Sequence, residues 1–253
     1  MMYIQSMKAS KKFSLLKTVS LFAFMLITAG CASAGRELIV SENSPIALAL
    51  ITANYDINWK DEEKTVASGT GKTLRRMMRV DPDWTVITKS EGIIDEIEQT
   101  IYNTLNGSPL ISLAPKEDVL NSQAYNEAKT TPIRESREMV KPSGYRFVVS
   151  RDKDFRAKFA NETGIQKTFY IALKLTKAMA SGFGKNGKGL ANVAMTMTIK
   201  DIQGKNLWNK TYEIRSLDRF KVTSGAYSEE ELLALFPPMI KDICLDFLED
   251  LEY

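Results

Sequence analysis

Two glycine-rich stretches have residue types and spacing that could bind a nucleotide. The stretch ASGTGKT, Ala67 to Thr73, approaches the phosphate-loop pattern G-x-x-x-x-G-K-[ST]. Val66 stands where that pattern requires its first glycine, and the charged residues DEEKT before it cannot form the required buried strand. The stretch GFGKNG, Gly182 to Gly187, matches the dinucleotide pattern G-x-G-x-x-G, but it joins two alternating runs instead of a strand and a helix. We therefore predict a flexible loop, a hairpin turn and no bound nucleotide.

Chemistry that depends on imidazole is excluded, because the chain contains no histidine. This removes Ser-His-Asp and Cys-His nucleophiles and the common zinc sites. Carboxylate pairs and serine–lysine arrangements stay open, but no spacing in the sequence singles one out. Asp56 and Asp152 are candidate carboxylates, and we interpret each as a turn or cap residue. The sequence therefore predicts no catalytic residue, no metal site and no cofactor.

The N-terminus has the layout of an export signal. A leader with four lysines precedes the apolar run TVSLFAFMLIT, which is too short to remain as a transmembrane helix of about 20 residues. The residues ITAGCAS resemble the lipobox of bacterial lipoproteins, in which the cysteine after the cleaved bond is acylated. Thr28 stands where that pattern prefers leucine, so an ordinary secretory signal cut near ASA is the alternative. We predict lipidation at Cys31, which would anchor the chain to the membrane through its acyl chains.

Cleavage before Cys31 would change the charge of the chain. Residues 1–30 carry four lysines and no acidic residue, so the mature chain would have 30 basic and 31 acidic side chains and a net charge of −1. No basic field then remains to predict nucleic-acid binding. We expect a signal peptide over 1–30, a small-residue tether over 31–44 and one domain over 45–253. Cys244 would be the single remaining thiol, and we interpret it as a core cysteine.

The first part of that domain mixes strand and helix patterns. The run from Ile46 to Ala53 is apolar on both faces and predicts a buried strand. Five apolar residues between Ser90 and Leu105 lie on one stripe and predict a helix, which Ser90 can cap. The remaining expectations are a strand LISLA at 110–114, a helix from Pro115 to about Ala128, a surface loop over 129–144, a strand GYRFVVS and a helix from Asp154 to Asn161.

The last third has the most regular pattern. TFYIALKLT and NVAMTMTIK alternate apolar and polar residues, DIQGK is a turn, and LWNKTYEI predicts a third strand of an antiparallel meander. Ser228 and Glu231 have the spacing of a capping box before an amphipathic C-terminal helix, which Pro237 and Pro238 bend or restart. We therefore predict an α+β fold, a single domain with a mixed sheet whose C-terminal antiparallel meander packs against helices.

Three stretches carry a resemblance to known proteins: PIALALI after the tether, LISLAPKEDVLNSQAY, and VAMTMTIKDIQGKNLWNKTYEI. Their order resembles a group of bacterial envelope lipoproteins. This group includes the curli-secretion channel lipoprotein, the lipoprotein activators of penicillin-binding proteins, and the N-terminal domain of the Tol-system propeller protein. The resemblance implies a fold and a location in the envelope, and it implies no catalytic residue.

The function predicted from these features is a non-enzymatic lipoprotein that acts as a binding or assembly module of the cell envelope. We expect an anchor at the outer membrane, because Ala32 follows Cys31 instead of aspartate, and an envelope protein as partner. Tyr55 and Trp59 lie on one face of NYDINW and are weak candidates for partner binding, because the favoured interpretation is that they cover the edge of the core. The alternative is an oligomeric secretion or pore component, since the runs 168–176 and 192–200 have the length of membrane strands. An envelope enzyme is the third possibility.

Overall fold

The computed structural model describes residues 36–40, 44–60, 88–131, 138–183 and 186–252. The chain divides into two compact units, Met1–Glu42 and Asn43–Tyr253. In the first unit, residues 36–40 are helical. We call the described residues of the second unit the body. The stretch ASGTGKT and the predicted loop after Lys60 lie outside the described residues, as does Cys31.

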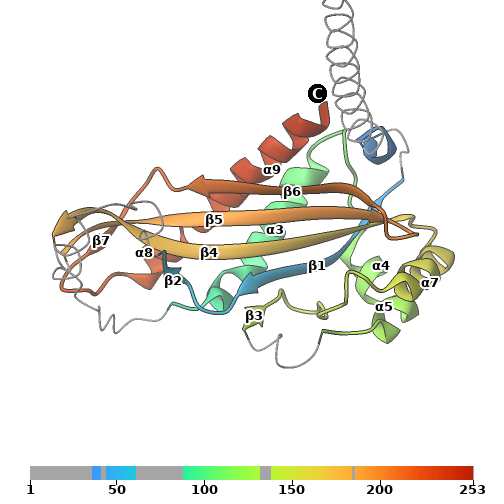
Figure 1. Ribbon diagram of the computed structural model, residues 1–253, viewed down its shortest axis with the longest axis horizontal. Coiled ribbons are helices and arrows are strands. Elements are labelled where there is room, and N and C mark those ends of the chain that lie inside the picture. Colours follow the sequence, from blue (N-terminus) through green and yellow to red (C-terminus); the bar gives the residue numbers. More distant parts are fainter. Residues whose placement is uncertain (1–35, 41–43, 61–87, 132–137, 184–185, 253) are drawn as a thin grey trace, which may run out of the picture. The chain divides into compact units, whose positions relative to one another are not determined.

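The body is built on one mixed sheet (Figure 1). The central order is β3-β1-β4-β5-β6, with β2 pairing with β4 and β7 with β5. Strands β1 and β2 run parallel to β4, whereas the other pairs are antiparallel, so β4, β5 and β6 form the predicted meander. The strands are β1 (Ile46–Asn54), β2 (Asn58–Trp59), β3 (Met139–Val140), β4 (Lys167–Phe183), β5 (Asn186–Asp201), β6 (Asn206–Arg215) and β7 (Phe220–Val222). The α+β class predicted from the sequence is confirmed.

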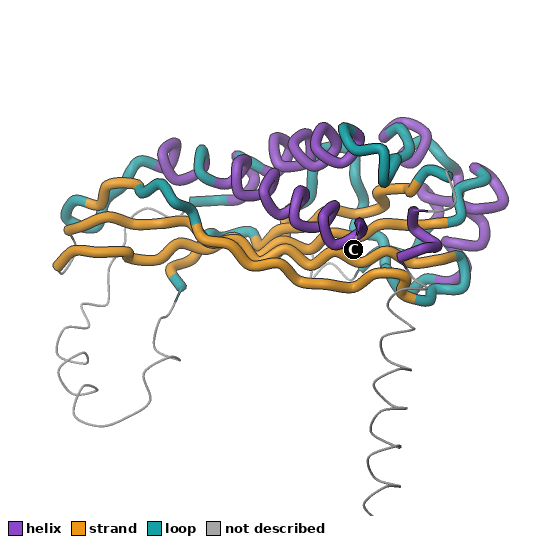
Figure 2. The backbone as a smooth tube through the Cα atoms, turned by 90° about the horizontal axis from the view of Figure 1, so that it is seen from above, coloured by secondary structure: helices purple, strands orange, loops and turns teal. Residues whose placement is uncertain are grey.

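The long helices cover one face of this sheet, and Figure 2 shows helices gathered along one side of the strand layer. Helix α3 (Ile94–Asn106) packs against α9 (Phe236–Glu252), and α9 contacts β5 and β6. Phe247 of α9 lies with its ring centroid 5.9 Å from that of Phe169 and 5.6 Å from that of Trp208. Burying each such side chain stabilises the fold by about 1.5–3 kcal/mol. The predicted inward faces of β4 and β5 are buried: Phe169, Ile171, Leu173, Leu175, Val193, Met195, Met197 and Ile199.

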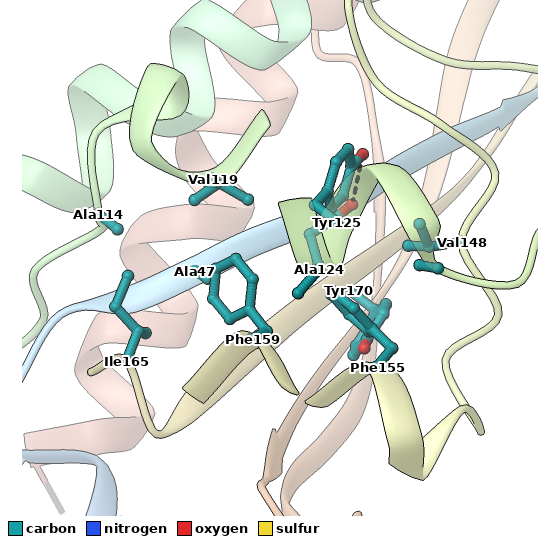
Figure 3. Packing of buried hydrophobic residues seen from close by; sticks show 12 residues of the cluster. Ala47, Ala114, Val119, Ala124, Tyr125, Val148, Phe155, Phe159, Ile165 and Tyr170 are labelled. Carbon is teal, nitrogen blue, oxygen red and sulfur yellow. Dashed lines mark hydrogen bonds between the residues drawn. The ribbon is translucent and has the colours of Figure 1, made fainter. Parts of the chain in front are cut away.

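A second group of core residues lies around the start of β1 and β4 (Figure 3). It is supplied by the short helices α4 (Lys116–Leu120) and α5 (Gln123–Glu127) and by α7 (Lys153–Thr163). The Tyr125 hydroxyl donates to the Ala49 carbonyl at 3.1 Å and accepts the Arg146 backbone N–H at 2.9 Å. Burial raises the pKa of Tyr125 to about 12, so the hydroxyl keeps the proton it donates.

Helix ends follow the sequence signals in several places. The Asp152 carboxylate accepts the Phe155 N–H at 3.3 Å and caps α7, as its interpretation as a cap residue predicted, and α7 stops at Gly164, whose φ is +75°. Ser228 accepts the Glu231 N–H at 3.1 Å and begins α8 (Glu229–Leu233). The capping box is only half formed, because the Glu231 carboxylate accepts the Lys221 N–H instead. A separate helix, α9, starts at Phe236, so the two prolines restart the helix.

Two predicted strands are wrong. In LISLA only Leu113 makes a ladder contact, an isolated bridge to Ile46. The Leu113 N–H is taken by the Asn106 side-chain oxygen at 2.8 Å, and such a donor is lost to strand pairing. In GYRFVVS only Val148 forms a bridge, with Thr130, because the Arg146 N–H is held by the Tyr125 hydroxyl. Side-chain acceptors, 7 residues away for Leu113 and 21 residues away for Arg146, thus take donors that the ladder would need.

Two helix predictions also need correction. The helix expected from Pro115 to Ala128 is broken at Ser122, whose hydroxyl caps α5 by accepting the Tyr125 N–H at 3.1 Å. Ser90 is not a helix cap. It is buried at the start of a short 3-10 turn, η2 (Ser90–Gly92), and its N–H donates to the Tyr55 carbonyl at 2.9 Å. Helix α3 begins later, without a side-chain cap. The expected surface loop 129–144 contains β3, which pairs with β1.

Candidate binding face

The second face of the meander is polar. Side chains alternate along a strand, so the residues between the buried positions of β4 and β5 point away from α9. Opposite one another in the ladder lie Thr196 and Thr211, with their hydroxyls 2.8 Å apart, and Thr198 donates to Asn209 at 3.0 Å. We define the polar face by these residues: Ala172, Lys174, Thr176, Asn192, Ala194, Thr196, Thr198, Lys200, Asn209, Thr211, Glu213 and Arg215.

A hollow of about 840 Å³ lies at one end of the polar face. Its described lining is Asn54, Asn58, Trp59, Lys60, Lys174, Thr176, Asn192, Val193, Ala194, Glu213, Ile214 and Arg215. The register explains this grouping, because Thr176 is paired with both Asn58 and Asn192, and Asn192 with Arg215. The hollow therefore draws on four neighbouring strands and on the end of β1.

Asn192 is the unusual member of this set. Its side chain is only 4% exposed, and neither its amide nitrogen nor its oxygen has a hydrogen-bond partner. A buried polar group left without a partner costs about 1–3 kcal/mol, and native proteins contain few of them. The residues around the hollow therefore include a buried amide whose hydrogen-bonding groups are not satisfied within the described body.

Asn54, in the same lining, is fully paired. Its side-chain oxygen accepts the Leu175 N–H at 2.7 Å, and its side-chain nitrogen donates to the Leu175 carbonyl at 2.9 Å and to the Asp56 carbonyl. These bonds tie β1 to β4 where β1 ends. Asn54 therefore positions the wall of the hollow.

Charge on the polar face is mainly positive. The hollow has three cationic side chains, Lys60, Lys174 and Arg215, against one carboxylate, Glu213. A second hollow of about 310 Å³ includes Arg151 in its lining. The Lys200 pKa is lowered, first by burial and then by Arg156 and Arg151, which shows cations gathering there too. The face favours an anionic partner, although the mature chain as a whole would be close to neutral.

Of the predicted partner residues, Trp59 is among the described lining residues of the hollow and Tyr55 is not. The Trp59 ring centroid is 6.1 Å from those of Phe220 and Tyr227, and the Lys177 ammonium sits 5.5 Å from the Trp59 ring. The Lys89 ammonium lies 5.1 Å from the centre of the Tyr55 ring. Both aromatic residues are half-buried. Contact of either one with a partner stays a prediction.

Lys177 is a buried cation that sequence reasoning missed. It is 2% exposed, donates to the Ile57 carbonyl, and lies 5.0 Å from the Tyr227 ring. Burial lowers its pKa to about 8, against smaller opposing effects of Glu229 and Asp56. The sequence signal for Lys177 was its position, because it continues the inward-facing series of β4 after Leu175. Asn192 pairs with Thr176 and directly precedes the inward Val193, so it lies on the polar face.

The other residues that the sequence singled out have structural roles in the fold. Gly182 and Gly187 face each other near the end of the β4–β5 hairpin, as expected for a turn. Added Cβ atoms there would lie within 3 Å of backbone atoms, so glycine is required for the close approach. Cys244 is buried among the core residues, and burial raises its thiol pKa to about 12. Asp56 follows β1, and its backbone forms an isolated antiparallel β-bridge with that of Lys89.

Two further features are missing from the described residues. Within the described ranges, no group of three or more Cys, Asp or Glu side chains is arranged to hold a metal ion. Among the helices of the same residues, none is long and apolar enough to cross a membrane.

Comparison with known proteins gives little similarity. No protein-family model and no curated protein sequence matches the chain. Among solved structures, the chain is similar to the C-terminal domain of LpoB from Salmonella enterica, with 9% sequence identity and a TM-score of 0.27. The match covers 73% of this chain and 96% of that domain. A TM-score this low does not establish a shared fold, so the similarity supports no inference about function.

Proposed function

We propose that this chain is a non-enzymatic lipoprotein, anchored through acyl chains on Cys31, whose body binds an envelope protein through the polar face. The single observation that carries the proposal is the hollow of that face, with a buried amide that has no partner inside the body. The proposed location is the outer membrane, facing the periplasm or the exterior, and no bound cofactor is required.

The polar face has properties that suit binding. Its side chains stand on three long paired strands, and sites on regular elements hold their geometry better than sites on loops. A buried amide without a partner lowers the stability of the free body, and such local departures from an optimal fold are typical of functional positions. Its cationic side chains would speed encounter with an anionic partner.

The apolar faces of β4 and β5 support a binding module over an oligomeric pore. These faces are buried within the body, where helices α3 and α9 cover the sheet. Strands that crossed a membrane would instead present an apolar face to lipid. In this proposal the protein contacts lipid through acyl chains on Cys31, and two or more such chains would give stable anchoring.

Site-specific photo-crosslinking in cells tests the proposal. A photo-reactive amino acid at Ala172 or Thr211, both exposed on the polar face, should give a discrete crosslinked partner. The same amino acid at Asp242, exposed on α9, is the matched control and should give much less of that product. Equal crosslinking at all three positions, or none at the polar face, would reject the polar face as the binding surface.

A further inference from the structure

We propose that the hollow of the polar face binds an extended acidic peptide segment of the partner, with the Asn192 carboxamide paired to the backbone of one peptide residue. This inference rests on the proposed function and adds the chemistry of the ligand. It follows from the unpaired amide, from a matching contact inside the body, and from the charge and the aromatic content of the lining.

The Asn192 carboxamide defines the group that would complete it. It offers one acceptor and two donor hydrogens, and both of its polar atoms are buried without a partner. A residue in an extended chain presents its own N–H and C=O on the same side, as strand pairing requires. One such residue can therefore satisfy both ends of the carboxamide at once. It must first displace a neighbouring side chain, since the amide atoms are out of contact with water.

Asn54 makes this very pair within the body. Its carboxamide accepts the N–H and donates to the C=O of a single residue of β4, Leu175, at 2.7 and 2.9 Å. The contact shows that strand backbone at this position can be held by an asparagine side chain. Asn192 lines the same hollow, and its carboxamide has the same chemistry with no backbone residue in place.

Charge selects among peptides. Lys60, Lys174 and Arg215 line the hollow, and Glu213 is the one carboxylate among its described lining residues. A peptide with acidic side chains beside the paired residue would bring opposite charges together, whereas a basic peptide would meet three cations. The ligand is therefore an acidic segment.

The aromatic content of the lining disfavours a sugar ligand. Trp59 is the one aromatic side chain in the described lining, and its ring packs with Phe220 and Tyr227 and lies beside the Lys177 ammonium. The Lys177 ammonium lies over this ring, so the body itself occupies that aromatic surface, whereas stacking on a free aromatic face is a common way to hold a sugar ring. A peptide backbone needs no such platform.

Binding of defined probes to the full mature chain in detergent tests the inference. The probes are acetyl-Glu-Thr-Glu-Thr-Glu-Thr-Glu-amide, the same peptide with lysine in place of glutamate, and a tetramer of N-acetylglucosamine. Calorimetry should show saturable binding of the acidic peptide alone. The Asn192→Leu and Lys174→Glu proteins should each bind it at least tenfold more weakly, and the Asn161→Leu protein, altered at an exposed position of α7 outside the polar face, should bind it as the unaltered chain does.

A second measurement separates a binding role of Asn192 from a structural one. Asn192→Leu removes an unpaired buried amide, so it should raise the melting temperature by about 3 °C while it weakens peptide binding. A lower melting temperature would assign Asn192 to the fold and overturn the inference. Binding of the lysine peptide or of the sugar tetramer in preference, or binding of no probe, would overturn it as well. If crosslinking at Ala172 and Thr211 persists in that case, the proposed function stands and only the ligand chemistry is wrong.

Discussion

Buried polar side chains set the chemistry of this protein at the residue scale. Asn54 and Asn192 line the same hollow, yet one is fully bonded and the other has no partner. The Lys177 ammonium lies 5.5 Å from the Trp59 ring and 5.0 Å from the Tyr227 ring, and it donates to the Ile57 carbonyl. A satisfied hydrogen bond at each of these groups raises the free energy of unfolding, and an unsatisfied one lowers it. Substitution of each group can therefore be followed by a stability measurement.

The Lys177 side chain predicts a pH dependence of stability. Its pKa is about 8 in the folded body against an ordinary value of 10.5, so between these values the unfolded chain holds one more proton. Stability rises with pH wherever the unfolded state binds more protons, so the contribution of Lys177 is lowest below pH 8 and grows as pH rises. We expect the free energy of unfolding to increase by about 1 kcal/mol between pH 7 and 9 from this group.

Urea unfolding of the unaltered and Lys177→Met proteins at pH 7, 8 and 9 measures this contribution. The rise should be present in the unaltered protein and in the Lys174→Met control, which alters an exposed lysine of the same strand, and absent from Lys177→Met. The window ends at pH 9 because tyrosines such as Tyr125 act in the opposite direction above pH 10. An unchanged slope in Lys177→Met would show that the lysine keeps an ordinary pKa.

The two faces of β4 have opposite roles at the element scale. Leu173 is 6% exposed on the face covered by helices, and its neighbour Ala172 is exposed on the polar face. A carboxylate at position 173 would be buried without a partner, at a cost of several kcal/mol, comparable to the whole stability of a domain. We expect Leu173→Asp to unfold the body and Ala172→Asp to leave it folded. Circular dichroism and light scattering in buffer without detergent provide the readout.

The outcome for Leu173→Asp also distinguishes the binding module from the pore. If β4 served to cross a membrane, the altered protein would keep a folded remainder and fail only to insert. Ring-sized, detergent-dependent particles of the unaltered chain, together with a folded Leu173→Asp protein, would favour the secretion or pore component.

Helix α7 depends on its N-terminal cap. The Asp152 side chain is buried and accepts the Phe155 N–H at 3.3 Å and the Lys129 N–H at 3.2 Å. Asp152→Ala should lower the free energy of unfolding by about 1–2 kcal/mol, the usual effect of losing such a cap. Asp154→Ala, which removes an exposed carboxylate two residues further along the chain, should change stability little in the same urea experiment. Equal effects of the two substitutions would argue against the cap.

The whole molecule is proposed to be a lipid anchor, a tether and a folded body, each with a separate physical role. The body buries its own apolar residues, so its attachment to a membrane is assigned to Cys31 and to the acyl chains proposed there. Two or more acyl chains hold a protein stably on a bilayer, whereas one chain binds only reversibly. The tether over 31–44 would let the polar face reach a partner at a distance from the membrane.

Removal of the anchor should leave the body intact. Cells fed labelled palmitate should label the unaltered chain, and the Cys31→Ala protein should lose the label and its partitioning into detergent. The body of Cys31→Ala should keep the circular dichroism of the unaltered protein. Partitioning that survives the substitution would favour the ordinary secretory signal with Cys31 incidental.

Local patterns in the sequence predicted those elements whose interactions are local. Alternation predicted β4, β5 and β6, because residues two apart share a face whatever the partner is. The stripe of apolar residues predicted α3 and α9, and Ser228, Asp152 and the Gly182 turn were recognised from bonds that span a few residues. The predictions of strands at LISLA and GYRFVVS were wrong because a backbone donor of each is taken by a side chain. Asn106 lies 7 residues from Leu113 and Tyr125 lies 21 residues from Arg146, and the alternation of apolar residues contains no information on either bond.

By itself the sequence determined the fold class and the exclusion of imidazole chemistry, since each depends on composition or short spacing, and it predicts the export and lipobox signals from the same kind of local pattern. Only the tertiary structure decided where the polar face lies and what lines its hollow. Asn54, Lys174, Asn192 and Arg215 come from four strands, and strand register alone places them together. The loss of water around Asn192 and Lys177 likewise depends on packing from distant segments, and no pattern of neighbouring residues encodes it.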